Sequence, residues 1–293
     1  MSLLKQAAEK ARTRFHPLHR LRKNLLYQRI LQPCLDIPIP ANLGLRHPVY
    51  LRILTHFSFL FLSQKMEENL LQTCKIILGH LHVEEHSFID VGANIGLYTW
   101  SALDTKPDLH VAAFEPDPRN TALLKRTQKR WGAPNLKMHF SAASNNHGQA
   151  SFSQDVLSSA TGSLDQSEPS FSEHHYRQRK SLIEVPTVTL DCVTKTLPPP
   201  ALVKIDVEGH EQEVLEGAQK TLMGHRPILL IESFGEKVAA IRQILEPLGY
   251  HFQDADHSGN TTVKTMNYLC LAPEKTECKL LSALSKKGYL FNS

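Results

Sequence analysis

The stretch Phe88-Ile89-Asp90-Val91-Gly92-Ala93-Asn94-Ile95-Gly96-Leu97-Tyr98-Thr99-Trp100 decides the fold of this 293-residue chain. Its first four residues predict a buried strand, and Leu97–Leu103 predicts the start of a helix. Gly92 and Gly96 allow positive φ and let the backbone approach a ligand without a Cβ in the way. Such a turn places free N–H groups at the carboxyl end of a strand, where open α/β sheets bind ligands.

Two acidic residues at neighbouring strand ends indicate what this turn binds. Asp90 ends the first predicted strand, and Glu115 follows the next apolar run, His110–Phe114. An acid in the second position accepts hydrogen bonds from a ribose diol, and the first acid suits a positively charged amine. S-adenosylmethionine carries both groups. These residues alone equally allow a general nucleotide-binding α/β domain, although the G-x-G-x-x-G dinucleotide pattern fails at Asn94 and Leu97.

Three segments resemble the FkbM-type methyltransferases, which use S-adenosylmethionine and are typically O-methyltransferases. The segments are Phe88–Thr99, Ala113–Pro118 and Leu202–Glu211, in the order that the family shows. The resemblance runs from about His47 to Pro273. It implies an α/β fold of the class I methyltransferase (Rossmann-like) type, with a mostly parallel seven-stranded sheet, helices on both faces and a C-terminal antiparallel hairpin.

The resemblance also implies a cofactor site for S-adenosylmethionine. Asp90 and Asn94 are expected near the methionine end, Glu115 on the ribose and Pro116 beside the adenine. The stretch 141–148 resembles a family turn that places a small residue against the adenine. The expected cofactor-binding residues are Asp90, Gly92, Ala93, Asn94, Gly96, Glu115, Pro116, Ala142 and Ser144.

Catalysis is expected at the end of the strand predicted for Ala201–Val207. An alcohol is a poor nucleophile at neutral pH, so a general base is useful. Asp206, Glu208 and His210 are the candidate catalytic residues, because they follow one another at alternate positions and a histidine titrates near neutrality. The two acids are alternatively caps for the helix predicted over His210–Met223.

A divalent cation is a further option at this strand end. Asp206, Glu208 and Glu232 offer carboxylates that would orient two hydroxyls of an acceptor, and oxygen ligands favour Mg²⁺ over Zn²⁺. The pattern does not require the ion, so no metal ligand is assigned.

The chain divides into four predicted parts. Residues 1–40 form a basic N-terminal helical extension, with a linker over Pro33–Pro40, and residues 41–85 form a cap of a strand and a helix. Residues 86–275 form the methyltransferase domain, and 276–293 form a tail. Within the domain, 151–180 is expected to be a mostly irregular or hairpin excursion over the carboxyl face, serving either as a lid that helps choose the acceptor or as a solvated loop. A strand is expected over Ile183–Leu190.

Charge is concentrated at the N-terminus. Residues 1–30 carry a net charge of +7, whereas the rest of the chain carries about −3. The nearly balanced charge of the remainder gives no reason to expect a specific nucleic-acid partner. The family resemblance implies a small-molecule or glycan acceptor. Residues 1–32 predict a basic amphipathic helix broken near Pro17, favoured as a docking helix with a solvated basic face and alternatively a membrane-surface arm. Its helically spaced leucines are Leu18, Leu21, Leu25 and Leu26.

Cysteine usage and hydropathy indicate a cytoplasmic protein, membrane-peripheral if the N-terminal arm contacts lipid. The five cysteines include no Cys-x-x-Cys pair and are expected to be reduced. No apolar run reaches the roughly 18 residues of a membrane span, and no secretory signal is expected. The sequence does not indicate the oligomeric state.

Two other functions stay open at this point. A nicotinamide-dependent oxidoreductase is disfavoured by the missing third glycine and by the lack of a Tyr-x-x-x-Lys motif. A non-catalytic S-adenosylmethionine-binding protein would keep the same cofactor residues without turnover.

Overall fold

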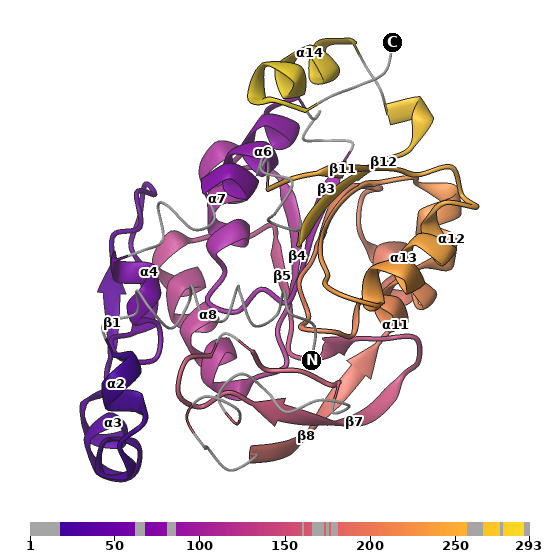
Figure 1. Cartoon of the computed structure of the whole chain (residues 1–293). Helices are drawn as coiled ribbons and strands as arrows, with labels where there is room; N and C mark the ends of the chain where they lie inside the picture. Colours follow the sequence, from indigo (N-terminus) through magenta and orange to yellow (C-terminus); the bar gives the residue numbers. More distant parts are fainter. Residues whose placement is uncertain are drawn as a thin grey trace.

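A seven-stranded sheet forms the centre of the computed structural model (Figure 1). The structure describes residues 18–61, 68–80, 86–159, 161–165, 173, 176, 181–256, 266–275 and 278–289. The strand order is β11-β12-β10-β9-β3-β4-β5. The strands are β3 (Ser87–Val91), β4 (His110–Phe114), β5 (Leu136–His139), β9 (Pro200–Ile205), β10 (Ile228–Glu232), β11 (His251–Asp254) and β12 (Asn267–Leu271).

The sheet is mostly parallel. β3 pairs in parallel with β4 and β9, and the same direction continues to β5 and β10. β12 runs antiparallel to both β10 and β11. Every residue of β3 and β9 is buried, as expected for parallel strands that are covered on both faces. This topology, with its terminal hairpin, confirms the predicted class I methyltransferase fold.

Helices cover both faces of the sheet and bury two large apolar cores (Figure 1). One core surrounds Trp100 and Leu124, and the other surrounds Val214 and Ile241. The helices of the first face are α6 (Glu68–Gly79), α7 (Leu97–Thr105) and α8 (Pro118–Trp131). Those of the second face are α10 (Leu190–Val193), α11 (Glu211–Glu216), α12 (Gln219–Gly224) and α13 (Lys237–Leu245).

The N-terminal part is more ordered than the sequence suggested. α2 (His19–Arg22), the π-helix η1 (Tyr27–Leu31) and α3 (Gln32–Leu35) precede a small antiparallel pair, β1 (Pro38–Ala41) and β2 (Val49–Arg52), and then α4 (Phe57–Phe61). The linker predicted over Pro33–Pro40 is therefore wrong, because its ends lie in α3 and β1. Residues 1–17 lie outside the described part of the chain.

A separate three-stranded sheet lies beside the carboxyl ends of the main strands. It consists of β6 (Ala142–Ala143), β7 (Gly148–Gln154) and β8 (Ser181–Val188), in the order β6-β8-β7. β8 matches the strand expected over Ile183–Leu190, and β7 shows that the excursion starts as a hairpin arm. Its basic residues at 177, 179 and 180 lie outside the described residues.

The helix predicted over His210–Met223 is two helices. A Cβ at Gly217 would lie 2.0 Å from the carbonyl oxygen of Ser144, so the backbone of β6's exit loop passes directly against this point. The Asp191 carboxylate accepts hydrogen bonds from the N–H groups of Lys220 and Thr221 and restarts the helix as α12. Close backbone packing, which no sequence period reports, thus divides the segment.

The predicted C-terminal tail contains a helix that joins the core. α14 (Cys278–Lys287) packs against α6 and buries Leu280 and Leu284. Thr73 of α6 and Tyr289 share a hydrogen bond of 2.9 Å between their hydroxyls. Within the described ranges, each helix is too short or too polar to span a bilayer.

Candidate active site

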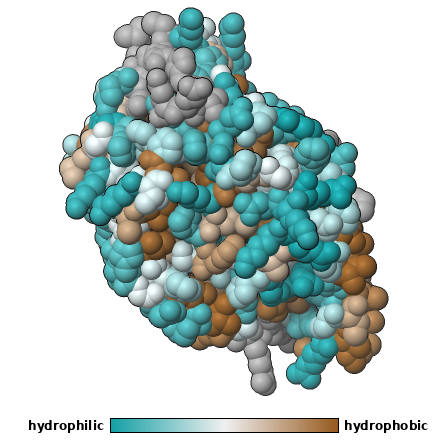
Figure 2. All heavy atoms as spheres, turned by 180° about the vertical axis from the view of Figure 1, so that it is seen from behind, coloured by the Kyte–Doolittle hydropathy of each residue, from teal (hydrophilic) through white to brown (hydrophobic). Residues whose placement is uncertain are grey.

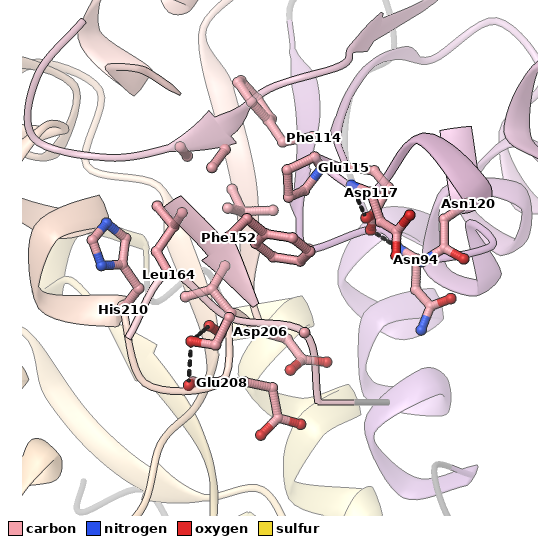
Figure 3. A pocket seen from close by; sticks show the side chains of 18 of the residues that line it. Asn94, Phe114, Glu115, Asp117, Asn120, Phe152, Leu164, Asp206, Glu208 and His210 are labelled. Atoms are coloured by element: carbon pink, nitrogen blue, oxygen red, sulfur yellow. Dashed lines mark hydrogen bonds between the residues drawn. The ribbon is translucent and has the colours of Figure 1, made fainter. Parts of the chain in front are cut away.

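A pocket opens at the carboxyl ends of β3, β4 and β9, where open α/β sheets bind ligands (Figure 3). The turns after these strands form one wall, and β6 together with residues 155, 159 and 162–164 forms the other. Five of the expected cofactor residues line it, namely Gly92, Asn94, Glu115, Pro116 and Ala142. The three candidate catalytic residues, Asp206, Glu208 and His210, line it as well.

Gly92 makes the corner of the pocket. Its φ is +80°, and a Cβ there would lie 1.8 Å from the carbonyl oxygen of Asp206. The chain after β9 can approach the turn after β3 only because this side chain is missing. The turn's N–H groups are not free as predicted: those of Gly92 and Ala93 donate to the carbonyl of Phe114 at 3.0 and 2.9 Å.

Glu115 joins the turn after β3 to the turn after β4. One carboxylate oxygen accepts the N–H of Asn94 at 2.7 Å, and the other accepts the N–H of Asp117 at 2.8 Å. The side chain lines the pocket but is almost completely buried. Burial raises the pKa of Glu115 to about 8, against the lowering effect of these backbone donors. The carboxylate is therefore held rigidly at the pocket wall.

Asn94 contributes an unsatisfied acceptor to the same wall. Its backbone is left-handed, with φ +54°, and its side-chain Nδ2 donates to the carbonyl of Ser159 at 2.7 Å. Its Oδ1 is buried and accepts no hydrogen bond from the described residues. A buried amide oxygen without a donor is costly, so a ligand N–H or O–H would stabilise this site.

Asp90 does not reach the pocket, although it was expected near the methionine end. Its carboxylate is fully buried beneath α7 and accepts hydrogen bonds from the N–H and hydroxyl of Thr99 at 3.0 and 2.7 Å. Lys204 Nζ lies 3.9 Å from the other oxygen. Burial raises the pKa of Asp90, and the nearby ammonium opposes that rise. Asp90 thus fixes α7 on the sheet and does not line the ligand space.

Three further expected cofactor residues lie outside the pocket lining: Ala93, Gly96 and Ser144. Gly96 begins α7 with φ +86°, and a Cβ there would lie 2.5 Å from Trp100 Nε1. Its role is to pack the turn against the helix. Ser144 instead binds a catalytic candidate, since its hydroxyl shares a 3.0 Å hydrogen bond with His210 Nε2.

Asp206 and Lys204 bring charge to the end of β9. Lys204 Nζ donates to Asp206 Oδ2 at 3.1 Å and lies 4.5 Å from the centre of the Tyr98 ring. Lys204 itself is buried and lies within ion-pair distance of both the buried Asp90 and the pocket-lining Asp206. This pairing holds Asp206 in one position at the pocket floor.

His210 lies on the side of the pocket opposite Glu115 and Asn94, as Figure 3 shows. Its Nδ1 is 3.3 Å from Glu213 Oε2, and its Nε2 bonds Ser144. Burial lowers the pKa of His210 below its ordinary value, and the acid at Glu213 opposes this shift. The ring is therefore neutral near neutral pH, as a general base requires.

Three groups without a predicted role hold the turn that carries these candidates. The Ser163 hydroxyl donates to the carbonyl of Glu208 at 2.8 Å, and Lys237 Nζ donates to that of Gly209 at 2.6 Å. The Gly209 N–H donates to Glu211 Oε1 at 2.7 Å. Glu211 belongs to the segment Leu202–Glu211 that resembles the family, so the sequence could have indicated a role for it at the site. Ser163 lies in the stretch 161–164, which resembles a Gly-Ser-Leu segment of the family, whereas Lys237 begins α13 and carried no signal.

No metal cluster forms at this end of the sheet. Within the described ranges, no group of three or more His, Cys, Asp or Glu side chains could hold an ion. Asp206, Glu208 and Glu232 are therefore not brought together as the cation option required. Three histidines that are possible metal ligands by residue type, His82, His174 and His175, lie outside the described residues.

Several known proteins are similar to parts of this chain. A curated relative, the hexuronic acid methyltransferase AglP of Haloferax volcanii, is 28% identical over 141 residues, or 47% of this chain and 52% of that protein. The chain thus matches about half the length of that relative. A methyltransferase FkbM from Methylobacillus flagellatus has a TM-score of 0.45 at 19% identity, covering 66% of this chain and 45% of the other.

A second solved structure is more distant. The precorrin-6y C5,15-methyltransferase of Geobacter metallireducens has a TM-score of 0.40 at 14% identity, covering 70% of this chain and 87% of that one. The family model described as the methyltransferase FkbM domain matches residues 90–252, which is more than half of the chain. The match includes the turns after β3, β4 and β9 that line the pocket. The chain therefore belongs to the FkbM methyltransferase family.

Proposed function

We propose that this methyltransferase uses S-adenosylmethionine to methylate a hydroxyl oxygen of a sugar, a glycan or a related metabolite. One observation carries the cofactor assignment: Glu115 and Asn94 line one pocket beside the Gly92 corner, and the buried Asn94 Oδ1 accepts no hydrogen bond from the described residues. A carboxylate after the second strand suits a ribose diol. The orphan amide oxygen suits a donor such as the amino or hydroxyl groups of the same molecule.

The residues of this chain fit that cofactor. Gly92 lets the turn after β3 lie against the carbonyl of Asp206 at the pocket corner, and Pro116 and Ala142 line the same pocket as the apolar Phe152 and Leu164. When bound, S-adenosylmethionine supplies an electrophilic methyl group. The protein's remaining tasks are to position an acceptor hydroxyl and to take its proton.

His210 is the base that the geometry favours. Its ring is neutral near pH 7 because burial disfavours the charged form, and Ser144 and Glu213 fix the ring orientation. The proton of the acceptor hydroxyl would pass to an imidazole nitrogen. Asp206 and Glu208 would accept hydrogen bonds from other hydroxyls of the acceptor.

The lining also favours a class of acceptor. Asp206 and Glu208 belong to the part of the wall that the structure describes, and no lysine or arginine lines that part. Asp117 and Asp155 line it too, but they are buried and their carboxylates accept hydrogen bonds from backbone N–H groups. Carboxylates accept hydrogen bonds from neutral hydroxyls and repel anions. The name of the Haloferax relative supports a sugar, and this wall favours a neutral sugar over a uronic acid.

The deciding experiment is transfer of a tritiated methyl group to purified neutral sugars, uronic acids, glycans and lipid extracts. Label in a neutral sugar or glycan supports the proposal. Binding of S-adenosylhomocysteine without transfer to any acceptor would favour a non-catalytic cofactor-binding protein. Binding of a reduced nicotinamide nucleotide in place of S-adenosylhomocysteine would revive the oxidoreductase.

The first prediction concerns Glu115. Glu115→Ala should weaken S-adenosylhomocysteine binding by about 1–3 kcal/mol, because the ribose hydroxyls lose a buried hydrogen-bond partner. Calorimetric titration measures the change. Glu184→Ala, at an exposed position of β8, is the matched control and should leave the affinity unchanged. Equal affinities in both variants would remove Glu115 from the cofactor site.

The second prediction concerns His210. His210→Ala should lower kcat by about 10²–10⁴-fold while the affinity for S-adenosylhomocysteine stays the same. In wild type, the rate should fall as the pH drops below the lowered pKa of His210, because the ring then gains a proton. This acid limb should disappear in the variant. His251→Ala, on the exposed side of β11, is the control. A retained acid limb would exclude His210 as the base.

A further inference from the structure

The helices at residues 18–37 expose apolar side chains where a surface segment normally exposes polar ones. Six large apolar residues there are between 42% and 58% exposed. They are Leu21, Leu25, Leu26, Ile30, Leu31 and Leu35, and Ile37 follows them. The reverse view shows hydrophobic atoms gathered at the lower right, the side on which α2 and α3 lie (Figures 1 and 2). We call this surface the N-terminal face.

The opposite side of the same helices is polar and buried. Arg22 donates to the carbonyls of Leu54 and Thr55 at 2.8 and 3.1 Å. Gln28 Nε2 donates to the carbonyl of Tyr176 at 2.9 Å. The inward residues Arg22 and Gln32 are almost completely buried. Most of the leucines that were predicted to dock are therefore exposed, whereas Arg22 and Gln32 are buried against the protein.

This exposure cannot be relieved by rotating the helices. A rotation that buried Leu25 or Ile30 would expose the body of Arg22 and Gln32 and break their hydrogen bonds to backbone carbonyls. The structure thus holds the apolar side outward. Contiguous exposed apolar surface of this kind marks an interaction site.

We propose that the N-terminal face docks on an anionic membrane surface. Exposed Arg20, Lys23 and Arg29 accompany the apolar residues. The single acid between residues 18 and 37, Asp36, is buried and accepts the N–H groups of Leu54 and Thr55. The face therefore combines insertable leucines with positive charge and exposes no negative charge, which is the composition of an interfacial helix.

Charge also argues against a second copy of this chain as the occupant. A twofold dimer would place the same face on both sides and bring Arg20, Lys23 and Arg29 toward their own copies. The preceding residues add Lys5, Lys10, Arg12 and Arg14 against one acid, Glu9. Anionic lipid headgroups neutralise this charge, whereas a like-charged partner increases it.

The face is built onto the pocket wall. Gln32 Nε2 donates to the carbonyls of Val156 and Leu157 at 3.2 and 3.1 Å. Asp155, directly before this pair, and Ser159, two residues after it, line the pocket. Docking through the N-terminal face would therefore hold the pocket close to the lipid surface.

The test is sedimentation of the full chain with phosphatidylcholine vesicles, with and without phosphatidylserine. We expect binding to the anionic vesicles that weakens as salt is raised. The variant Leu25→Ser/Ile30→Ser/Leu35→Ser should bind about tenfold or more weakly, because its inserted apolar area is lost. Leu182→Ser/Met223→Ser removes exposed apolar residues elsewhere and should bind like wild type. Unchanged thermal unfolding shows that both variants fold.

Cys34 supplies an independent probe, since it is exposed on α3. A polarity-sensitive dye on Cys34, in a chain with Cys192→Ser and Cys278→Ser, should shift to the blue with anionic vesicles. The same dye on Cys192, with Cys34→Ser and Cys278→Ser, should not shift. The proposal is overturned if the triple variant binds vesicles as well as wild type does. It is equally overturned if wild type is a dimer that this variant dissociates and neither binds vesicles.

Discussion

At the scale of single residues, buried acids shape the pocket turn. Glu211 is almost completely buried, accepts the Gly209 N–H and lies 3.5 Å from the Ser233 hydroxyl. Burial raises the pKa of Glu211 from 4.5 to about 7. The folded state therefore keeps a proton that the unfolded state releases between these two values.

This linkage gives a prediction on stability. As the pH rises from about 5 to about 8, wild type should lose about 1–3 kcal/mol of unfolding free energy relative to Glu211→Gln. The loss occurs because the native state binds more protons than the unfolded state in that window. Urea unfolding at each pH measures it. Glu236→Gln, at an exposed acid, should track wild type throughout. Parallel curves for wild type and Glu211→Gln would contradict the buried proton.

Asp90 and Glu115 show how far single residues could be placed from sequence. Both acids follow apolar runs, and the sequence treated them as equivalent strand tips. The register pairs Asp90 with Ala113, so Asp90 lies two residues deeper in the sheet than Glu115. Register comes from pairing between strands, which a single strand's pattern does not contain. The sequence therefore placed Glu115 at the pocket edge and misplaced Asp90.

At the scale of elements, the sequence predicted the helices and strands whose ends are set by their own residues. α8 begins with the Asp117 side chain accepting the Arg119 N–H, and it ends at Gly132 with φ +64°. Both signals are legible in the sequence. The division at Gly217 and the strand β1 depend on contacts with distant backbone, so no local pattern announces them.

α14 allows an element to be tested. Leu284→Ala should cost about 2–5 kcal/mol of unfolding free energy, because Leu284 is fully buried against the first core. Urea denaturation measures the loss. Met223→Ala, at a side chain that is 56% exposed, should change stability by less than about 0.5 kcal/mol. An unchanged free energy of unfolding in Leu284→Ala would contradict the packing of α14 against the core.

At the scale of the whole molecule, the pocket and the N-terminal face should act separately. S-adenosylhomocysteine at about 100 times its Kd should stabilise the fold by about 2.7 kcal/mol and raise Tm by about 4–10 °C. The triple serine variant of the N-terminal face should show the same rise, because none of its changed residues lines the pocket. Glu115→Ala should show a smaller rise. Loss of the rise in the triple variant would mean that the two sites are coupled.

The pairing of β6 with β8 has a consequence for how this molecule can diversify. Ala142 and Ala143 pair with Thr187 and Val188, so the excursion leaves and rejoins the body of the protein at one place. Its length can then change without displacing β5 or β9. Descendants of such a chain can acquire a new wall over the Gly92 corner, provided that the two short ends still match and that Gln32, Asn94 and Glu208 keep their hydrogen bonds to the excursion.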